Sequence, residues 1–340
     1  MMTRNWPFKG IGAGAFFLGW FGACSSVGSK PAPEPRPVLD ASENPFAGAR
    51  LWTDPDSAAA GYARRVRDEQ PEAAKNLEAM ANQPTALWAG EWVGEIEPWV
   101  RRHAQKLGRK KYLPVFVAYN IPFRDCGLYS KGGLESAEAY RQWIAGFARG
   151  LGSTKAVVIL EPDAIAHVGT CLDEVGWNQR YRLIREAIET FARLGTVHVY
   201  LDAGHSKWVP ADEMTERLKQ AGIASATGFS LNVSNYRATD ELVAYGKKLS
   251  AGVGGKPFVL DTSRNGNGPP SVSAEGEGSW CNPRGRAVGH LPGADTGDPL
   301  VHAYLWIKRP GESDGTCNGG PAAGEFWPEI AVELASGMAR

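Results

Sequence analysis

Acidic residues follow four apolar segments of this 340-residue chain, soon after the point where each segment ends: Asp125, Asp163, Asp202 and Asp314. If those segments are parallel strands of one sheet, their carboxyl ends lie along one edge, and the four carboxylates gather there. Clustered carboxylates either bind a hard cation or perform acid–base chemistry, in which neighbouring negative charges keep a proton on one member. The spacing therefore predicts a site for one of these two kinds of chemistry.

Aromatic residues beside these acids favour the second kind: Trp52, Trp88, Tyr119, Trp208 and Trp280. Flat apolar rings suit the faces of sugar rings better than they suit an ion. The cysteines form no CxxC pair and do not cluster with histidines, which argues against a zinc site. We therefore predict a saccharide-binding site that works by acid–base chemistry, with no metal and no cofactor.

Asp163 and Glu161 are both candidates for the proton donor. A donor must be neutral at about pH 6–7, which requires that burial or neighbouring carboxylates raise its pKa. Asp125 and Asp202 could raise the pKa of Asp163 in this way. Because side chains two positions apart share a face of an extended chain, the residues alone leave the choice between Asp163 and Glu161 open.

Apolar runs alternate with amphipathic stretches from about residue 46 onward, as in parallel α/β folds. The runs are nearly continuous, which is typical of strands buried on both faces, and they cover Thr85–Ala89, Leu113–Tyr119, Ala156–Glu161, Val197–Asp202, Ala226–Asn232, Pro257–Asp261 and His302–Lys308. The helical patterns cover Ala58–Gln70, Trp92–Leu107, Leu134–Leu151, Asn178–Leu194, Asp212–Ala221, Thr239–Ser250 and Glu325–Ser336. The alternation predicts an α/β fold: a distorted, incompletely closed barrel of about seven parallel strands with right-handed crossovers.

Domain organisation and composition limit the partners. The barrel is expected to form one domain over residues 46–340, in which the aperiodic segment Arg264–Asp298 is predicted to be a functional loop. The apolar fraction of 43% and charged fraction of 22% exclude global disorder. Basic and acidic residues both number 37, which gives no electrostatic reason to expect a nucleic-acid partner. We therefore expect a folded monomer that binds no nucleic acid.

The N-terminal segment has the pattern of a bacterial export signal. A basic stretch ends at Lys9, and the apolar run that follows up to Ala23 is too short to span a bilayer comfortably. Small residues before Cys24 resemble a lipoprotein processing box, which predicts a signal peptide over residues 1–23 and a lipid on Cys24. The alternative is ordinary secretion with cleavage after Ser25 or Ser26. Residues 24–45 are rich in serine and proline and are predicted to be a tether, so the mature chain is expected to be a cell-surface lipoprotein or a secreted protein.

Four further cysteines remain if Cys24 carries a lipid: Cys126, Cys171, Cys281 and Cys317. Four cysteines in an exported protein predict two disulfides. A bridge between near neighbours closes a loop of a few tens of residues, which contributes about 3–4 kcal/mol in the chain-entropy account.

Six blocks, in order, resemble the signatures of glycoside hydrolase family 6: Tyr119–Cys126, Val158–Asp163, Tyr200–His205, Asn232–Tyr236, Trp280–Pro283 and Leu305–Gly315. The resemblance extends from about Asn44 to the C-terminus. It implies a distorted α/β barrel that hydrolyses β-1,4-glucan, mainly cellulose, with inversion at the anomeric carbon. Inversion needs a protonated acid on one side of the bond and a base on the other, with room for water.

The resemblance also implies roles for the four acids. Asp163 is similar to the general acid that protonates the leaving oxygen, in preference to Glu161. Asp125 would help Asp163 keep its proton and order the water, and Asp202 would adjust the electrostatics of the acid. Asp314 is the candidate for the general base.

Further positions match sugar-binding residues of the family: Trp52, Tyr119, Ser130, His205, Trp208, Asn232, Trp280, Lys308 and Glu312. Among these, Tyr119 would crowd the sugar and favour a distorted ring, and Ser130 would hold the water. The resemblance pairs the cysteines as Cys126–Cys171 and Cys281–Cys317. His302 stands where the family commonly has an aspartate, which puts the support of the segment after it in doubt.

Several hypotheses follow from the resemblance. The modest segment between Arg264 and Trp280 favours an open cleft and internal cleavage, the mode of an endoglucanase. The alternatives are a cellobiohydrolase that acts from chain ends and a non-catalytic glucan-binding protein of the cell surface. A metal-dependent polysaccharide-modifying enzyme is a further alternative.

Overall fold

A computed structural model of the chain describes residues 43–270 and 280–339. The predicted signal peptide, Cys24 and most of the predicted tether lie outside the described residues, as does part of the predicted functional loop. Asn44 belongs to the folded part, because its Nδ2 donates to the carbonyl of His302 at 2.8 Å.

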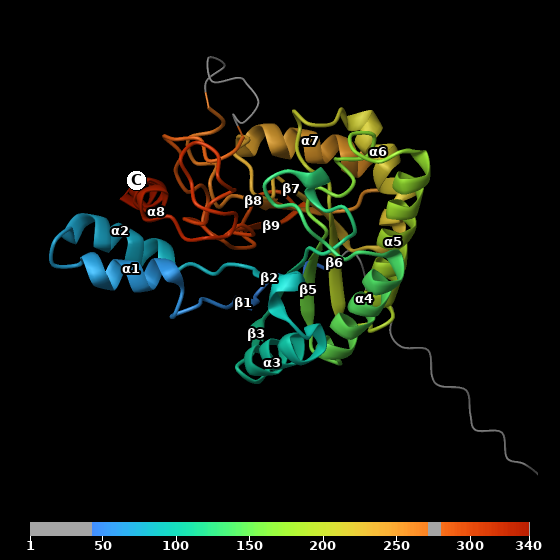
Figure 1. The fold of residues 1–340 in the computed structure, drawn as a ribbon, viewed down its shortest axis with the longest axis horizontal. Helices are drawn as coiled ribbons and strands as arrows, with labels where there is room; N and C mark the ends of the chain where they lie inside the picture. Colours follow the sequence, from blue (N-terminus) through green and yellow to red (C-terminus); the bar gives the residue numbers. More distant parts are fainter. Residues whose placement is uncertain (1–42, 271–279, 340) are drawn as a thin grey trace, which may run out of the picture. The chain divides into compact units, whose positions relative to one another are not determined.

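Seven parallel strands form the sheet in the described part of the chain: β2 (Leu87–Ala89), β4 (Val115–Ala118), β5 (Ala156–Leu160), β6 (Val197–Asp202), β7 (Gly228–Leu231), β8 (Phe258–Asp261) and β9 (Val301–Leu305). Each strand pairs with the next in chain order, and no pairing joins β9 to β2 among the described strands. The sheet is therefore a strongly curled, incompletely closed barrel (Figure 1), as predicted.

Helices lie between the strands: α1 (Ala58–Val66), α2 (Pro71–Ala81), α3 (Ile96–Arg109), α4 (Ala137–Leu151), α5 (Glu174–Ala192), α6 (Ala211–Gln220), α7 (Thr239–Gly252) and α8 (Pro328–Ala335). The helix expected over Ala58–Gln70 is wrong in extent, because α1 ends at Val66 and a separate α2 begins at Pro71. Proline suits the first helical turn, where its missing N–H costs no hydrogen bond.

The segment expected as one strand over Leu113–Tyr119 is divided in the structure. Its start, β3 (Tyr112–Leu113), pairs with the short β1 (Arg50–Leu51), and β4 belongs to the main sheet. Pro114 lies between the two strands and has no N–H to give to a ladder. The first strand of the described chain, β1, therefore lies beside the segment that leads into β4.

Alternate residues of each strand enter two different cores. In β5, Val158 and Leu160 pack among the helices, and Val157 and Ile159 point into the barrel interior. This alternation on a two-sided sheet explains why the strands are nearly continuous apolar runs. Figure 1 shows α4 and α5 along one side of the sheet.

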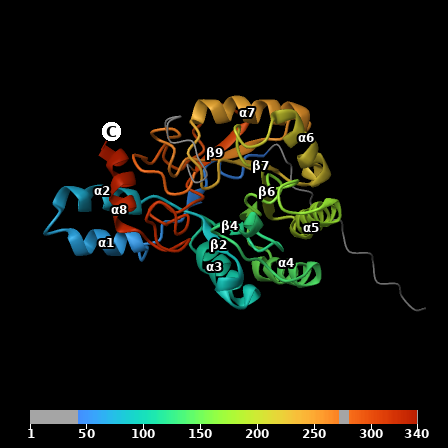
Figure 2. The same cartoon turned by 45° about the horizontal axis from the view of Figure 1, so that its top comes forward.

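A separate apolar cluster joins α1, α2 and α8. Leu77, Ile330 and Leu334 meet there around Trp306, which follows β9. Both views show these three helices together (Figure 2). The cluster therefore joins α8 to α1 and α2. No helix in the described segments is long and apolar enough to cross a bilayer.

Histidines at the amino ends of the strands are buried without charge. The Tyr200 hydroxyl and His302 Nδ1 lie 2.7 Å apart, so His302 is a satisfied core residue. Burial lowers the pKa of His302 to about 4, and His198 adds to the effect. Burial likewise lowers the pKa of His198 to about 4, and neither of its ring nitrogens has a hydrogen-bond partner in the structure.

We expect His198→Leu to reduce the loss of stability that acid causes. The unfolded histidine takes up a proton near pH 6.5, but the folded one does so only near pH 4. Above pH 6.5 this histidine is neutral in both states and does not lower the free energy of unfolding. Below that pH, protonation of the unfolded state lowers the free energy of unfolding, by about 2 kcal/mol between pH 7 and pH 5. Urea unfolding at both pH values, in the wild type and the variant, measures the difference.

The comparison with the wild type is essential because buried carboxylates act in the opposite direction. Burial raises the pKa of Glu161 to about 7 and that of Asp202 to about 6, so protonation of these groups stabilises the fold as pH falls. An equal change in both proteins between the two pH values would contradict the prediction.

Candidate active site

A cleft of about 550 Å³ lies where the carboxyl ends of the strands meet. It brings together most of the predicted site residues: Tyr119, Asp125, Ser130, Asp163, His205, Trp208, Trp280, Lys308 and Asp314. They come from loops that follow different strands, which is why residues up to about two hundred positions apart in the sequence line the same cleft.

Asp163 occupies the wall of this cleft directly after β5. Its backbone N–H donates to Asp202 Oδ2 at 2.9 Å, and the Tyr119 hydroxyl lies 3.4 Å from its Oδ2. Burial raises the pKa of Asp163 well above its usual range, and the carboxylates of Asp202 and Asp125 raise it further. The arrangement keeps a proton on Asp163 at pH values where a free aspartate has lost it.

Glu161 faces away from the cleft. Its side chain is completely buried, and its Oε2 accepts from the backbone N–H groups of Asn120 at 3.0 Å and Ile121 at 3.1 Å. Glu161 thus fixes the start of the loop after β4, and it does not line the cleft in the described structure. Of the two candidate acids, Asp163 lines the cleft and Glu161 does not.

Asp125 belongs to the loop after β4 and lies in a strained stretch of its backbone. Phe123, Asp125 and Cys126 all have positive φ, at 56°, 55° and 49°, a conformation that is uncommon for residues other than glycine. Asp125 Oδ2 accepts from the Ser130 backbone N–H at 2.7 Å. The Ser130 N–H therefore fixes the Asp125 carboxylate, and both residues line the cleft.

Asp202 lies behind Asp163 at the end of β6. It is almost fully buried and accepts from Asp163 N–H, from Gly204 N–H at 3.1 Å and from Ser230 Oγ at 3.2 Å. Burial raises its pKa to about 6, although these hydrogen bonds favour the ionised form. Asp202 is therefore placed to influence Asp163 without reaching the cleft.

Asp314 forms the centre of a buried ionic cluster. Arg264 Nη1 donates to its two oxygens at 2.8 and 2.9 Å, and Tyr236 and the Asn282 N–H donate to Oδ2 at 3.1 Å. Lys308 Nζ lies 3.7 Å away. Burial alone would raise the pKa of Asp314, but Arg264 and Lys308 outweigh burial and hold it below its usual value.

The aromatic walls combine expected and unexpected residues. Trp88, which the sequence marks only as an aromatic neighbour of the acids, lines the cleft and meets Tyr119 edge to face at 5.4 Å between ring centroids. Trp208 and His205 also line the cleft, with 5.7 Å between their ring centroids. Burial lowers the pKa of His205 to about 4, so this ring is neutral near pH 7.

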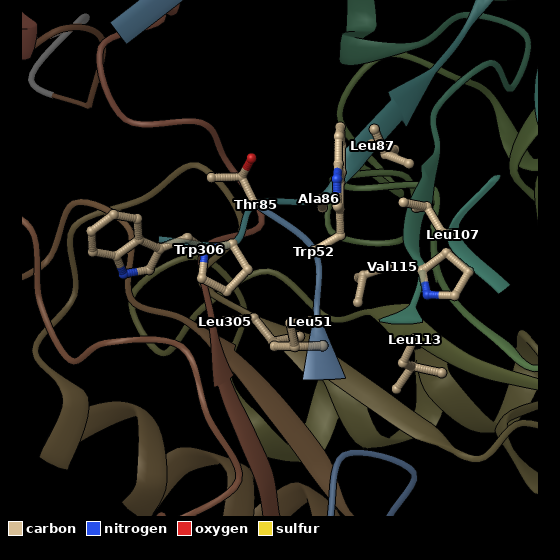
Figure 3. Close-up of a pocket in the computed structure, with 12 residues that line it drawn as sticks. Leu51, Trp52, Thr85, Ala86, Leu87, Leu107, Leu113, Val115, Leu305 and Trp306 are labelled. Carbon is tan, nitrogen blue, oxygen red and sulfur yellow. The ribbon is translucent and has the colours of Figure 1, made fainter. Parts of the chain in front are cut away.

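Three predicted sugar-binding residues lie outside the cleft. Asn232 is fully buried, and its Nδ2 donates to the Asp261 carbonyl at 2.8 Å, so it joins two loops. Glu312 is paired with Arg309 at 3.0 Å. Trp52 lines a second, small pocket, in which Leu87 and Leu107 lie nearby (Figure 3).

Residues without a sequence prediction also shape the site. His167 lines the cleft, its Nε2 lies 3.5 Å from Asp125 Oδ1, and its ring meets Trp208 edge to face. Asp261 ends β8 and accepts from the N–H groups of Ser234, Ser263, Ile307 and Lys308. The described residues contain no group of three or more His, Cys, Asp or Glu side chains that could hold a metal ion.

Two disulfides attach the acid-bearing loops, and their pairing confirms the one implied by the family resemblance. Cys126–Cys171 joins the loop of Asp125 to the loop that follows Asp163. Cys281–Cys317 joins the residue after Trp280 to the loop of Asp314. Each disulfide therefore limits the movement of a carboxylate that lines the cleft.

Replacing Cys126 and Cys171 together by alanine is expected to lower the free energy of unfolding by about 4 kcal/mol, because the bridge spans 45 residues. The loss of kcat should exceed that of the matched double variant Cys281→Ala with Cys317→Ala, because Asp125 is adjacent to Cys126 in a strained loop. Chemical unfolding and initial rates measure both quantities. A loss below about 1 kcal/mol would contradict the stability prediction.

Comparison with known proteins identifies the family. The sequence model of Glycosyl hydrolases family 6 matches residues 46–338. Endoglucanase A of Cellulomonas fimi is 44% identical over 261 residues, which are 76% of this chain and 55% of that protein. Endoglucanase 1 of Streptomyces halstedii is 43% identical over 296 residues, which are 84% of this chain and 88% of that protein. This chain thus spans about half of the Cellulomonas relative and most of the Streptomyces one.

A solved structure agrees with the sequence comparison. The endoglucanase of Mycobacterium tuberculosis, in complex with methyl-cellobiosyl-4-deoxy-4-thio-β-D-cellobioside, matches with a TM-score of 0.81 at 41% identity. The match covers 88% of this chain and 100% of that chain. The sequence match and the structural match indicate the same family: the chain belongs to glycosyl hydrolases family 6.

Proposed function

We propose that this protein is an inverting endo-β-1,4-glucanase that cleaves internal bonds of cellulose or a related β-glucan, with Asp163 as the general acid. One observation carries the proposal: Asp163 lines a cleft with aromatic walls, and burial, Asp202 and Asp125 all raise its pKa. A carboxylic acid that stays protonated near neutral pH can protonate the departing glycosidic oxygen.

The other residues have distinct roles in this proposal. Asp125, fixed by the Ser130 N–H, helps to retain the proton on Asp163 and orders the attacking water together with Ser130. Asp314 stays ionised because Arg264 and Lys308 lower its pKa, and it serves as the base on the other side of the bond. Tyr119 lies against Asp163 and crowds the sugar at the reacting position.

The aromatic side chains support a β-glucan as substrate. Trp88, Trp208 and Trp280 line the cleft, and their flat rings can stack on successive glucose units, whose axial faces are apolar. His205 and Lys308 contribute polar groups for the hydroxyls. The relatives named endoglucanase and the thio-cellobioside complex of one of them support the same substrate class and internal cleavage.

Location and assembly complete the proposal. The two disulfides agree with export, because such bonds persist in oxidising compartments. We propose that residues 1–23 are removed as a signal peptide, that Cys24 is lipidated, and that residues 24–45 tether a monomeric catalytic domain to the cell surface.

The stereochemistry of the product tests the proposal. We expect proton NMR of a soluble cello-oligosaccharide with the purified protein to show the α-anomer as the first product, and Asp163→Ala to abolish it. An initial β-anomer would mean retention and would overturn the assignment of the four acids. Binding of the oligosaccharide without turnover would instead favour a glucan-binding protein.

A further inference from the structure

Helix α3 carries a concentrated positive charge in a chain whose total charge is balanced. Six basic residues lie between positions 101 and 111, and this interval contains no acidic residue: Arg101, Arg102, Lys106, Arg109, Lys110 and Lys111. All six side chains are exposed. Because the whole chain has 37 basic and 37 acidic residues, this concentration is a local feature of one surface.

The helix separates this charge from the core. Ile96, Val100, Ala104 and Leu107 are buried and recur at helical spacing on one face. With 3.6 residues per turn, the basic side chains of the helix point to the opposite side. Arg101, Arg102, Gln105, Lys106, Arg109 and Lys110 line a common depression on the surface.

Little of this charge is neutralised nearby. Arg101 pairs with Glu97, which also binds Arg149. Among the described residues, no carboxylate lies within ion-pair distance of the other five cations. Lys106 lies over the Trp52 ring at 5.7 Å from the ring centroid, which leaves its charge in place.

The basic face leads into the segment that pairs with the first strand of the described chain. Lys110 and Lys111 lead into β3, which pairs with β1 near the start of the described chain. A further cation, Arg50 of β1, lies over the Tyr112 ring at 4.6 Å. Helix α3 and strand β3 lie beside the amino end of β4 (Figure 1). The cleft is lined by loops that follow the carboxyl ends of the strands.

We propose that the basic face of α3 docks on an anionic phospholipid surface and turns the cleft away from the membrane. Charge complementarity carries the proposal, because each lysine or arginine near an anionic bilayer adds about 1 kcal/mol of attraction. The position of the face supports it: Glu43, the first described residue, lies 3.9 Å from Lys155, which directly precedes β5, so the described chain begins near the amino ends of the strands, where β3 also lies. A single lipid anchor combined with a basic patch holds a protein at a membrane more firmly than either alone.

Vesicle sedimentation tests the proposal on the mature chain, residues 24–340 carrying Cys24→Ser, which lacks the apolar N-terminal segment and cannot be lipidated. We expect binding to vesicles that contain phosphatidylglycerol to be about tenfold tighter than to pure phosphatidylcholine, and to weaken steeply as salt is raised. The variant Arg102→Glu/Arg109→Glu/Lys110→Glu should lose this preference. The matched variant Lys75→Glu/Arg182→Glu/Lys248→Glu changes the net charge equally through exposed cations of α2, α5 and α7 and should keep it.

The outcomes separate this proposal from the enzymatic one. The proposal would be overturned if the Cys24→Ser chain without charge reversals bound both vesicle types equally. It would also be overturned if the two charge-reversal variants lost the preference for anionic vesicles to the same degree. A preference for soluble polyphosphate over vesicles would overturn the membrane as partner. Circular dichroism checks that each variant is folded. Activity on a soluble glucan is expected to be unchanged in both variants, so a failure of docking leaves the hydrolase assignment untouched.

Discussion

Asp163→Asn is expected to lower kcat on a cello-oligosaccharide by about a thousandfold, the scale of a lost general acid. Asparagine has nearly the same shape but carries no acidic proton, and it also removes the repulsion between this carboxyl and Asp202 and Asp125. KM should change little, because the side chain contributes mainly to the transition state. Initial rates on unsubstituted oligosaccharides measure the effect.

The leaving group provides the control for this prediction. A dinitrophenyl β-cellotrioside releases an anion that is stable without protonation, so the loss of the acid should matter far less on this substrate. We expect Asp163→Asn to retain most of its activity there. An equal loss on both substrates would contradict the assignment of Asp163 as the acid.

Glu161→Gln is the matched substitution for the alternative acid. Glu161 is buried against the N–H groups of Asn120 and Ile121, away from the cleft. We expect this variant to lose stability and to affect both substrates to the same degree. A selective loss on the poor leaving group would transfer the acid role to Glu161.

The sequence predicts the barrel well because its strands are buried on both faces. A strand such as β5 has no polar position, so its apolar run is visible without knowledge of the fold. The same reasoning places acids after strands and thereby finds Asp125, Asp163 and Asp202. It does not find α2, which begins at Pro71 only four residues after α1 and continues a similar helical pattern.

Burial and orientation explain what sequence reasoning missed in the site. Asp261 ends a predicted strand just as Asp202 does, but its carboxylate is fully enclosed by backbone N–H groups and supports the loops. Asn232 and Glu312 have polar side chains that could bind sugar hydroxyls. In the structure, however, Asn232 donates a hydrogen bond to the Asp261 carbonyl and Glu312 forms an ion pair with Arg309. His167 lies in no regular element, and only the fold brings it to Asp125.

Arg264 is the most consequential of the residues that the sequence did not indicate, because it lowers the pKa of Asp314 and so favours its ionised form. Its guanidinium is almost fully buried, donates to both oxygens of Asp314 and lies over the Tyr236 ring at 4.4 Å. In the sequence it is one arginine in an aperiodic segment. The pair links the loop after β8 to the loop after β9, so stability and chemistry depend on the same contact.

Arg264→Gln is therefore expected to lower the free energy of unfolding by about 3–5 kcal/mol, the cost of leaving one member of a buried ion pair without its partner. The double variant Arg264→Gln/Asp314→Asn should recover part of that loss, because it removes the unpaired carboxylate as well. Arg284→Gln breaks a half-exposed pair with Glu333 and should cost less than about 1 kcal/mol. Urea unfolding of the four proteins measures these differences.

The same substitution tests whether Asp314 is the base. Arg264 lowers the pKa of Asp314, so its removal lets burial raise that pKa. A base must be ionised to act, and the acidic limb of the kcat/KM profile should therefore move to higher pH in Arg264→Gln. Arg284→Gln should leave the limb in place. If Arg264→Gln is destabilised but its acidic limb is not displaced, then Asp314 stabilises the loops without accepting the proton, and the base has to be sought among the other carboxylates of the cleft.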